Sequence, residues 1–159
     1  MLKINKKVEY ALIALKYMAQ KQQVSSELTS AREVCDQFKT PFDTTAKVMQ
    51  KMNNHNILNS VKGIKGGYSL AINLEQITYM DLVKIIEGKE LSTICESGRG
   101  LCECYEFCNI KSPIEQLNQK LGEYLENLTL SELLLSKGPL TSFSNSHLHQ
   151  PESSLVGEE

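Results

Sequence analysis

Apolar residues recur at the spacing of one helical face near the start of the chain, which predicts a helix from Lys6 to Gln20. The polar residues from there to Leu28 are typical of a loop. Ser30 and Glu33 then form a capping-box pattern, so a second and shorter helix is expected to begin at this point. Its apolar face includes Cys35, which is distant in sequence from the other cysteines and is therefore expected to lie in the core.

A third helix is predicted to start with Thr40 as N-cap, followed by Pro41, and to run to about Asn54. Its spacing turns one face inward, formed by Phe42, Thr45, Val48, Met49 and Met52. Its outward face carries polar and basic side chains of the kind that reach bases and phosphates in a major groove, namely Thr44, Lys47, Gln50 and Lys51. The two short helices form a helix-turn-helix candidate, whose candidate DNA contacts are Thr44, Thr45, Lys47 and Lys51.

A β-hairpin is predicted next, because residues 57–62 and 68–71 alternate in polarity around the glycine-rich segment 63–67. A hairpin placed after these helices indicates a winged helix-turn-helix. Glycines allow the backbone to approach a partner closely, so further candidate DNA contacts are Lys62, Lys65, Gly66, Gly67 and Tyr68. The expected fold class is mainly α with a small β-hairpin wing.

Two more helices are predicted beyond the wing. Thr78 caps the first, which Gly88 is expected to stop. A capping-box pattern from Ser112 to Glu115 starts the second, whose apolar residues follow at the alternating steps of a coiled coil: Ile114, Leu117, Leu121, Tyr124 and Leu128. This seam is expected to join two copies of the chain, although such a helix can also pack on its own winged domain.

These elements divide the chain into five parts. They are a winged helix-turn-helix domain (1–72), a connecting helix (73–92), a cysteine-rich loop (93–111), a dimerisation helix (112–137) and a tail expected to be disordered (138–159). The charge is divided too, because residues 1–70 carry eleven Lys and Arg against five Asp and Glu, whereas residues 71–159 carry six against fourteen. The basic front half favours a polyanion as its partner, and the alternative is a solvated basic face.

Four of the five cysteines fall within fourteen residues, at Cys95, Cys102, Cys104 and Cys108. Closely spaced thiolates can hold zinc or an iron-sulfur cluster, and the alternatives are disulfides or separate buried thiols. The N-terminus has no pattern of an export signal and no apolar run is long enough to span a membrane, so a cytoplasmic protein with reduced thiols is expected. A metal or cluster site is therefore favoured over disulfides.

The order of parts resembles the IscR/NsrR (Rrf) family of dimeric winged-helix regulators that carry an iron-sulfur cluster. The likeness covers about residues 1–135. It is carried by the opening Met1-Leu2-Lys3-Ile4 with Glu9-Tyr10-Ala11, by Val61-Lys62-Gly63 and Gly66-Gly67-Tyr68, by Ile85-Ile86-Glu87-Gly88, by the cysteine loop and by Leu128-Thr129-Leu130. Within the family the chain looks most like regulators of the SUF cluster-assembly genes.

The resemblance implies one cluster per subunit, 2Fe-2S or 4Fe-4S, bound by Cys95, Cys102 and Cys108. The gap between the first two is one residue longer than the commonest family version, and Cys104 is extra. Some members use a histidine just past the third cysteine, where this chain has Lys111. Others use a carboxylate from the partner's first helix, at the position of Glu9. The fourth ligand is thus expected to be Glu9 or Cys104.

The expected function is a homodimeric repressor that binds double-stranded promoter DNA and is switched by a cluster that senses iron, redox or nitric oxide status. One alternative keeps the DNA binding and replaces the cluster by structural zinc or a thiol-disulfide switch. Another is a small iron-sulfur electron carrier. An enzyme is not expected, because no nucleophile-base pair or phosphate-binding loop is present in the sequence.

Overall fold

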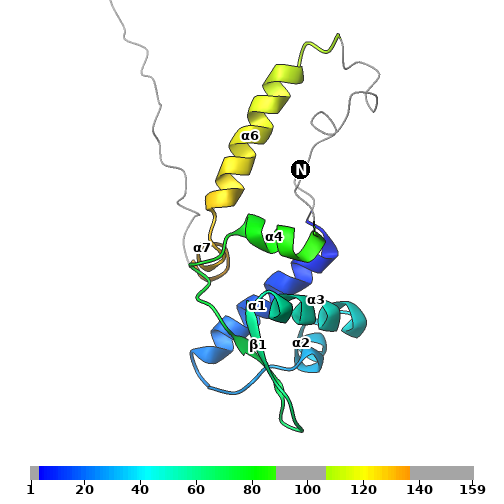
Figure 1. Ribbon diagram of the computed structural model, residues 1–159, viewed down its shortest axis with the longest axis vertical. Coiled ribbons are helices and arrows are strands. Elements are labelled where there is room, and N and C mark those ends of the chain that lie inside the picture. The colour runs from blue at the N-terminus through cyan, green and yellow to red at the C-terminus, as the bar shows by residue number, and fades with distance from the viewer. Residues whose placement is uncertain (1–3, 89–106, 137–159) are drawn as a thin grey trace, which may run out of the picture.

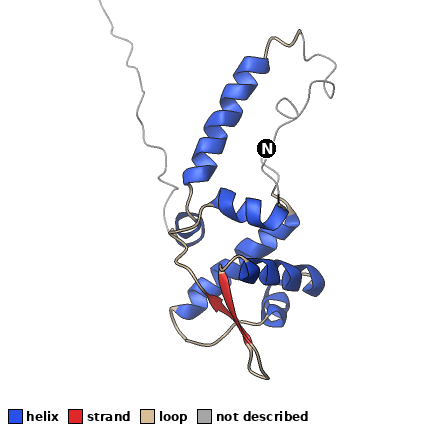
Figure 2. Ribbon diagram, in the orientation of Figure 1, coloured by secondary structure: helices blue, strands red, loops and turns tan. Residues whose placement is uncertain are grey.

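The computed structural model describes residues 4–88 and 107–136, which are mostly helical and carry one short hairpin that projects from the helices (Figures 1 and 2). In chain order the elements are α1 (Lys6–Gln22), α2 (Ala31–Phe38), α3 (Phe42–Asn54), β1 (Leu58–Val61), β2 (Gly67–Leu70), α4 (Tyr79–Glu87), α6 (Lys111–Asn127) and α7 (Leu130–Leu135). The predicted order of helices and hairpin is therefore confirmed. The predictions for Cys95, Cys102, Cys104 and the tail lie outside the described residues.

Helix α1 is at the centre of the core. Its buried side chains, Val8, Ala11, Ala14, Leu15, Met18 and Ala19, follow the helical face that the sequence predicts. They pack with buried residues of α3 and α4, such as Met49 and Leu82. Cys35 is also buried, as expected, and its sulfur accepts a hydrogen bond from the Thr40 hydroxyl at 3.5 Å. The core thus fixes α2, α3 and α4 around one helix.

The capping boxes predicted at Ser30 and at Thr78 are both present. The Ser30 hydroxyl accepts from the Glu33 N–H at 3.1 Å, and the Thr78 hydroxyl accepts from the Asp81 N–H at 3.2 Å. Gly88 ends α4 in the left-handed conformation (φ 73°), which glycine adopts at little cost.

Two predicted helix starts are wrong. Thr40 does not cap α3, whose N-cap is Pro41, and its hydroxyl instead accepts from the Thr45 hydroxyl at 2.9 Å. The box predicted at Ser112 is also absent: α6 has Ile110 as N-cap without a side-chain bond, so Ser112 already lies in the first turn. Pro113, the next residue, is tolerated in this turn because the first N–H groups of a helix have no hydrogen-bond partner inside the helix.

An ionic network fastens α2 to α1. The Lys21 Nζ donates to Glu33 Oε1 at 2.6 Å and to the Leu28 carbonyl at 3.1 Å, and the Tyr17 hydroxyl donates to the same carboxylate at 2.7 Å. Burial alone would raise the pKa of Glu33, but the hydrogen bonds from Lys21, Tyr17 and the Ser30 N–H outweigh it and hold this pKa below its usual value.

Replacing Glu33 by alanine is expected to lower the free energy of unfolding by about 2 kcal/mol at neutral pH, because a cap and two charge-assisted hydrogen bonds are lost together. A lowered carboxyl pKa stabilises the fold above its unfolded-state pKa, and that stability is lost as the pH falls through the lower native pKa. Urea denaturation of both proteins at neutral pH and at about pH 3 measures this. The difference between wild type and Glu33→Ala should shrink at the acidic pH, and an equal difference at both pH values would contradict the account.

The hairpin and the C-terminal end of α6 are both fastened to the rest of the fold by backbone hydrogen bonds. Strands β1 and β2 pair antiparallel from Leu58↔Leu70 to Val61↔Gly67. Thr29 and Tyr68 exchange two hydrogen bonds at 2.9 Å, which fixes the wing to the loop before α2. The Tyr79 N–H donates to the Leu128 carbonyl at 2.8 Å and so anchors the C-terminal end of α6 on the winged domain, while the rest of α6 projects from it (Figure 1).

Candidate nucleic-acid interface and cluster site

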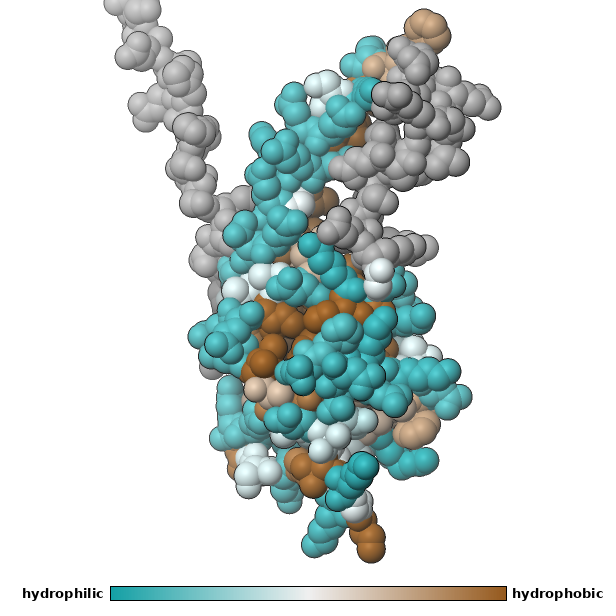
Figure 3. All heavy atoms as spheres, in the orientation of Figure 1, coloured by the Kyte–Doolittle hydropathy of each residue, from teal (hydrophilic) through white to brown (hydrophobic). Residues whose placement is uncertain are grey.

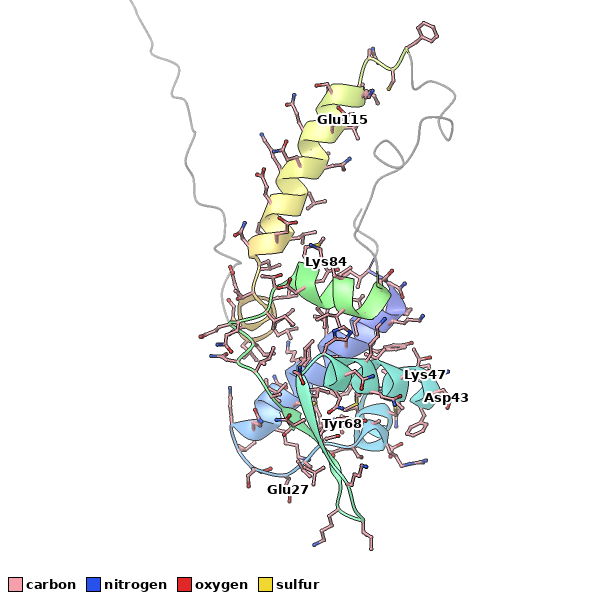
Figure 4. All side chains as sticks on the ribbon, in the orientation of Figure 1. Glu27, Asp43, Lys47, Tyr68, Lys84 and Glu115 are labelled. Carbon is pink, nitrogen blue, oxygen red and sulfur yellow. The ribbon has the colours of Figure 1, made fainter. Side chains whose placement is uncertain are left out.

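The outward face of α3 presents Lys47, which is exposed, and Thr44, which is half-buried. Figure 4 shows Lys47 and Asp43 at the outer edge of the winged domain. Thr45 was a wrong candidate for DNA contact, because it is fully buried and its hydroxyl bonds Thr40 inside the domain. A position whose side chain is enclosed on all sides cannot touch a base.

Lys51 contacts another helix of its own domain. Its Nζ donates to the Ile86 carbonyl of α4 at 3.2 Å, and the side chain is half-buried. This contact joins α3 to the last turn of α4, near residue 88, where the first described range of the chain ends. Lys51 therefore links two helices of its own chain, and its contact with DNA stays a prediction.

Two aromatic contacts that involve α2 were missed by sequence reasoning. Phe42, predicted to point inward, is 46% exposed, and the Arg32 guanidinium lies 5.1 Å from the centre of its ring. Tyr17 and Phe38 make an edge-to-face contact with ring centres 5.5 Å apart. Because Arg32 and Phe42 belong to different helices, the turn between these helices brings them together, and no spacing within one helix could have revealed it.

The wing carries the remaining candidate DNA contacts. Lys62 and Lys65 are exposed, whereas Gly66, Gly67 and Tyr68 are half-buried. A Cβ atom on Gly66 would lie 2.4 Å from the Val61 carbonyl oxygen, so only glycine fits this turn. The wing therefore has a fixed backbone with two exposed basic side chains near its end.

Two candidate cluster ligands lie in described residues, Glu9 and Cys108. Glu9 is in the first turn of α1, where its carboxylate accepts a hydrogen bond from the exposed Lys6 Nζ at 2.8 Å. That bond raises the pKa of Lys6. Cys108 is a partly exposed free thiol two residues before the N-cap of α6. Among the described residues no three His, Cys, Asp or Glu side chains are grouped so that they could hold a metal ion.

Glu9 and Cys108 are held apart within one chain. Helix α6 has 17 residues and is therefore about 25 Å long. Its C-terminal end is anchored on the winged domain beside α4, so its N-terminal end, next to Cys108, lies far from the first turn of α1 (Figure 1). A site that uses both side chains would need them from two different chains.

The predicted seam on α6 is only partly available to a partner. Leu117 and Leu121 are 60% and 41% exposed, and Ile114 and Tyr124 are half-buried. Leu128 was a wrong candidate for dimer contact, because it is 3% exposed and belongs to the core of its own chain. Helix α6 ends at Asn127, and a separate helix, α7, follows it with Thr129 as its N-cap, so the described part of the predicted segment 112–137 contains two helices. Ile110 is also exposed and extends the apolar stripe at the other end.

Within the described residues, no helix is long and apolar enough to cross a membrane.

Comparison with known proteins agrees with this architecture. Residues 4–135 match the Rrf2 family, described as iron-dependent transcriptional regulators. NsrR of Shouchella clausii (strain KSM-K16), an HTH-type transcriptional regulator, is 26% identical over 133 residues, which are 83% of this chain and 88% of the relative.

Two solved structures have a similar fold. T. potens IscR has a TM-score of 0.60 and 21% identity, over 84% of this chain and 86% of that one. CymR, the global cysteine regulator of B. subtilis, has a TM-score of 0.56 and 21% identity, over 84% of this chain and 97% of that one. The matching family and relatives are transcriptional regulators rather than enzymes. Because the family match spans nearly all of the described residues, the chain belongs to the Rrf2 family of transcriptional regulators.

Proposed function

We propose that this protein is a homodimeric repressor whose affinity for promoter DNA is switched by an iron-sulfur cluster. The proposed ligands are Cys95, Cys102 and Cys108, with Glu9 or Cys104 as the fourth. The observation that carries the switch is the Lys51–Ile86 hydrogen bond, because it connects the helix that reads DNA to the turn that leads into the cysteine-rich segment.

DNA binding is proposed for the surface formed by α3 and the wing. Lys47 on α3 and Lys62 and Lys65 on the wing are exposed, and none of them makes a salt bridge with another described residue. Ammonium groups without acidic partners favour phosphate contacts. In a dimer, two such surfaces would bind the two halves of a palindromic site, with each α3 in a major groove.

Cys108 is a better candidate for a cluster ligand than Cys35 is. Cys35 is enclosed in the core and bonded to Thr40, whereas Cys108 is accessible and stands at a helix end. A bound cluster would supply iron sites that react with oxidants and nitric oxide and are lost under iron shortage. The separation of Glu9 from Cys108 within one chain favours a carboxylate from the partner subunit if Glu9 is the fourth ligand.

We further propose that Lys51 transmits the state of the cysteine-rich segment to α3. Its ammonium group binds the last turn of α4, where carbonyls without a hydrogen-bond partner inside the helix carry partial negative charge and attract a cation. A shift of that turn would move α3 or break the hydrogen bond. Either change alters the angle at which α3 meets DNA, and a few kcal/mol of difference between the two arrangements suffices for a switch.

The DNA surface can be tested with Lys47→Ala. We expect about tenfold weaker binding to a duplex selected by the wild-type protein from a random library, and a less steep dependence of log affinity on log salt. Fluorescence anisotropy across a salt series measures both. The matched control is Lys120→Ala, which removes the same charge from an exposed position on α6. Equal losses in both variants would contradict the assignment of α3 to DNA.

The role of Lys51 can be tested with Lys51→Met. We expect the ratio of DNA affinities between cluster-loaded and iron-depleted protein to fall from at least about tenfold to within about threefold, because the lost hydrogen bond to a charged group is worth about 1.5–3 kcal/mol. The visible spectrum of the loaded protein should stay unchanged. The control Lys47→Met should weaken both forms and preserve their ratio. An unchanged ratio in Lys51→Met would show that coupling takes another route.

A second candidate function keeps the DNA binding and uses zinc or thiol oxidation as the switch. It is favoured by the fold shared with CymR, the global cysteine regulator of B. subtilis. The two proposals differ in colour and metal content, since a thiol switch has no visible absorbance and a zinc site contains stoichiometric zinc without iron.

A further inference from the structure

The end of the wing carries an apolar side chain that the fold does not use. Ile64 is fully exposed at the tip, and Val61, the last residue of β1, is 50% exposed. Figure 3 shows hydrophobic atoms at this tip, and in Figure 1 the tip lies at the opposite end of the described residues from α6. An apolar side chain stabilises a fold only when folding removes it from water. An isoleucine at the tip therefore adds nothing to the stability of this chain and is available to a partner.

The tip holds this side chain in a defined place. The Gly66 N–H donates to the Gly63 carbonyl at 2.9 Å, and Gly63 has a φ of 127°, which side-chain-bearing residues rarely adopt. Added Cβ atoms would collide with backbone at Gly66, 2.4 Å from the Val61 oxygen, and would crowd Thr29 at Gly67, 3.0 Å from its oxygen. The wing is also bonded to Thr29 by two hydrogen bonds. Binding through Ile64 therefore requires little further ordering of the backbone.

The charges beside Ile64 indicate the kind of partner. Lys62 and Lys65 flank it, and neither makes a salt bridge with another described residue. An apolar side chain between two cations matches a surface with phosphates outside and an apolar interior. The minor groove of DNA has phosphates along both edges, and apolar base faces become accessible inside it where a base step unstacks. Its width of about 6 Å accepts a single aliphatic side chain. A membrane surface is a poorer match, because interfacial binding needs a larger apolar face.

We propose that Ile64 is an apolar wedge that enters the minor groove beside each half-site, with Lys62 and Lys65 on the adjacent phosphates. This inference rests on the proposed DNA-binding function and adds to it a source of sequence specificity. Apolar wedges partly unstack a base step and kink the duplex. The cost is lowest at flexible pyrimidine-purine steps such as TA, so the protein would select the flanking sequence without a hydrogen bond to any base.

The test uses a duplex that the wild-type protein selects from a random library, in two versions that differ at the step found under the wing by hydroxyl-radical footprinting. One version has TA and the other GG at this step. Wild type is expected to bind the TA version about tenfold more tightly and to bend it, as measured by energy transfer between dyes on the duplex ends. Ile64→Ser should reduce the preference to within about twofold and bend the duplex less, whereas Ile64→Leu should keep both properties.

Two controls distinguish a wedge from a phosphate contact and from a membrane contact. Lys62→Ala should weaken both versions by the same factor and lower the salt dependence, because it removes a phosphate contact. If Ile64→Ser keeps the preference and the bend, the inference is wrong. If the same substitution instead abolishes binding to vesicles of phosphatidylcholine and phosphatidylglycerol and leaves DNA binding intact, the tip is a membrane contact and the inference is also wrong. If wild type shows no salt-dependent, sequence-specific binding at all, the proposed function itself fails.

Discussion

Replacing Leu117 and Leu121 together by glutamate is expected to convert the protein to a monomer and to weaken operator binding by at least about 100-fold. These leucines are the exposed centre of the α6 stripe. Burying unpaired carboxylates in an apolar interface costs several kcal/mol, so the dimer is expected to dissociate. Two linked half-site heads bind far more tightly than one, so loss of the dimer is also loss of most of the affinity.

Sedimentation velocity and DNA titration measure these two effects in the same preparation. The matched control is the pair Gln116→Glu and Gln119→Glu, which adds the same charges at exposed positions of α6 away from the stripe. The control protein should remain dimeric and should bind DNA only slightly more weakly. A monomeric control, or a dimeric Leu117→Glu/Leu121→Glu protein, would show that α6 does not dimerise through this stripe.

Replacing Cys108 by serine is expected to abolish the visible absorbance of protein purified without oxygen. A serine hydroxyl is a much poorer ligand for iron than a thiolate, and a cluster that loses one of four ligands is unstable. The DNA affinity of the variant should equal that of iron-depleted wild type, because both lack the cluster. Ultraviolet-visible spectra, iron analysis and DNA titration measure this result.

The control for Cys108 is Cys35→Ala. Cys35 lies in the core, so the substitution should lower thermal stability by leaving a small void but should keep the full visible spectrum. If Cys35→Ala loses the absorbance while Cys108→Ser keeps it, the ligand assignment is wrong. Glu9→Ala and Cys104→Ala then identify the fourth ligand, since one of them should make the cluster more labile.

The winged fold was largely predictable because its signals are local. The helical spacing in α1, the capping boxes at Ser30 and Thr78 and the glycines of the wing each specify structure through neighbours a few residues away. The predictions failed where another part of the chain determines the local structure. Ser112 has the sequence of a cap, but the helix starts one residue before it at Lys111. Leu128 continues the heptad spacing, but α6 ends before it and its side chain is buried in the core.

The site was less predictable than the fold for the same reason. Lys51 looks like a DNA contact on a helical wheel, and only the position of α4 shows that its ammonium group has a carbonyl partner. Phe42 is apolar and was therefore predicted to be buried. It lies at the surface instead, where the guanidinium of Arg32 from the preceding helix contacts its ring. For the cysteines, in contrast, the sequence is more informative than the structure. Their spacing and family resemblance point to a cluster, and Cys95, Cys102 and Cys104 lie outside the described residues.

The central claim is that a cluster bound to this protein changes its affinity for DNA. The most direct measurement is the dissociation constant of one anaerobic preparation for its selected duplex, taken before and after removal of iron with a chelator and followed by the visible spectrum. The account predicts a coloured protein whose absorbance disappears together with a change in affinity of at least about tenfold. A colourless protein with stoichiometric zinc, or a coloured one whose affinity stays the same after bleaching, would contradict it.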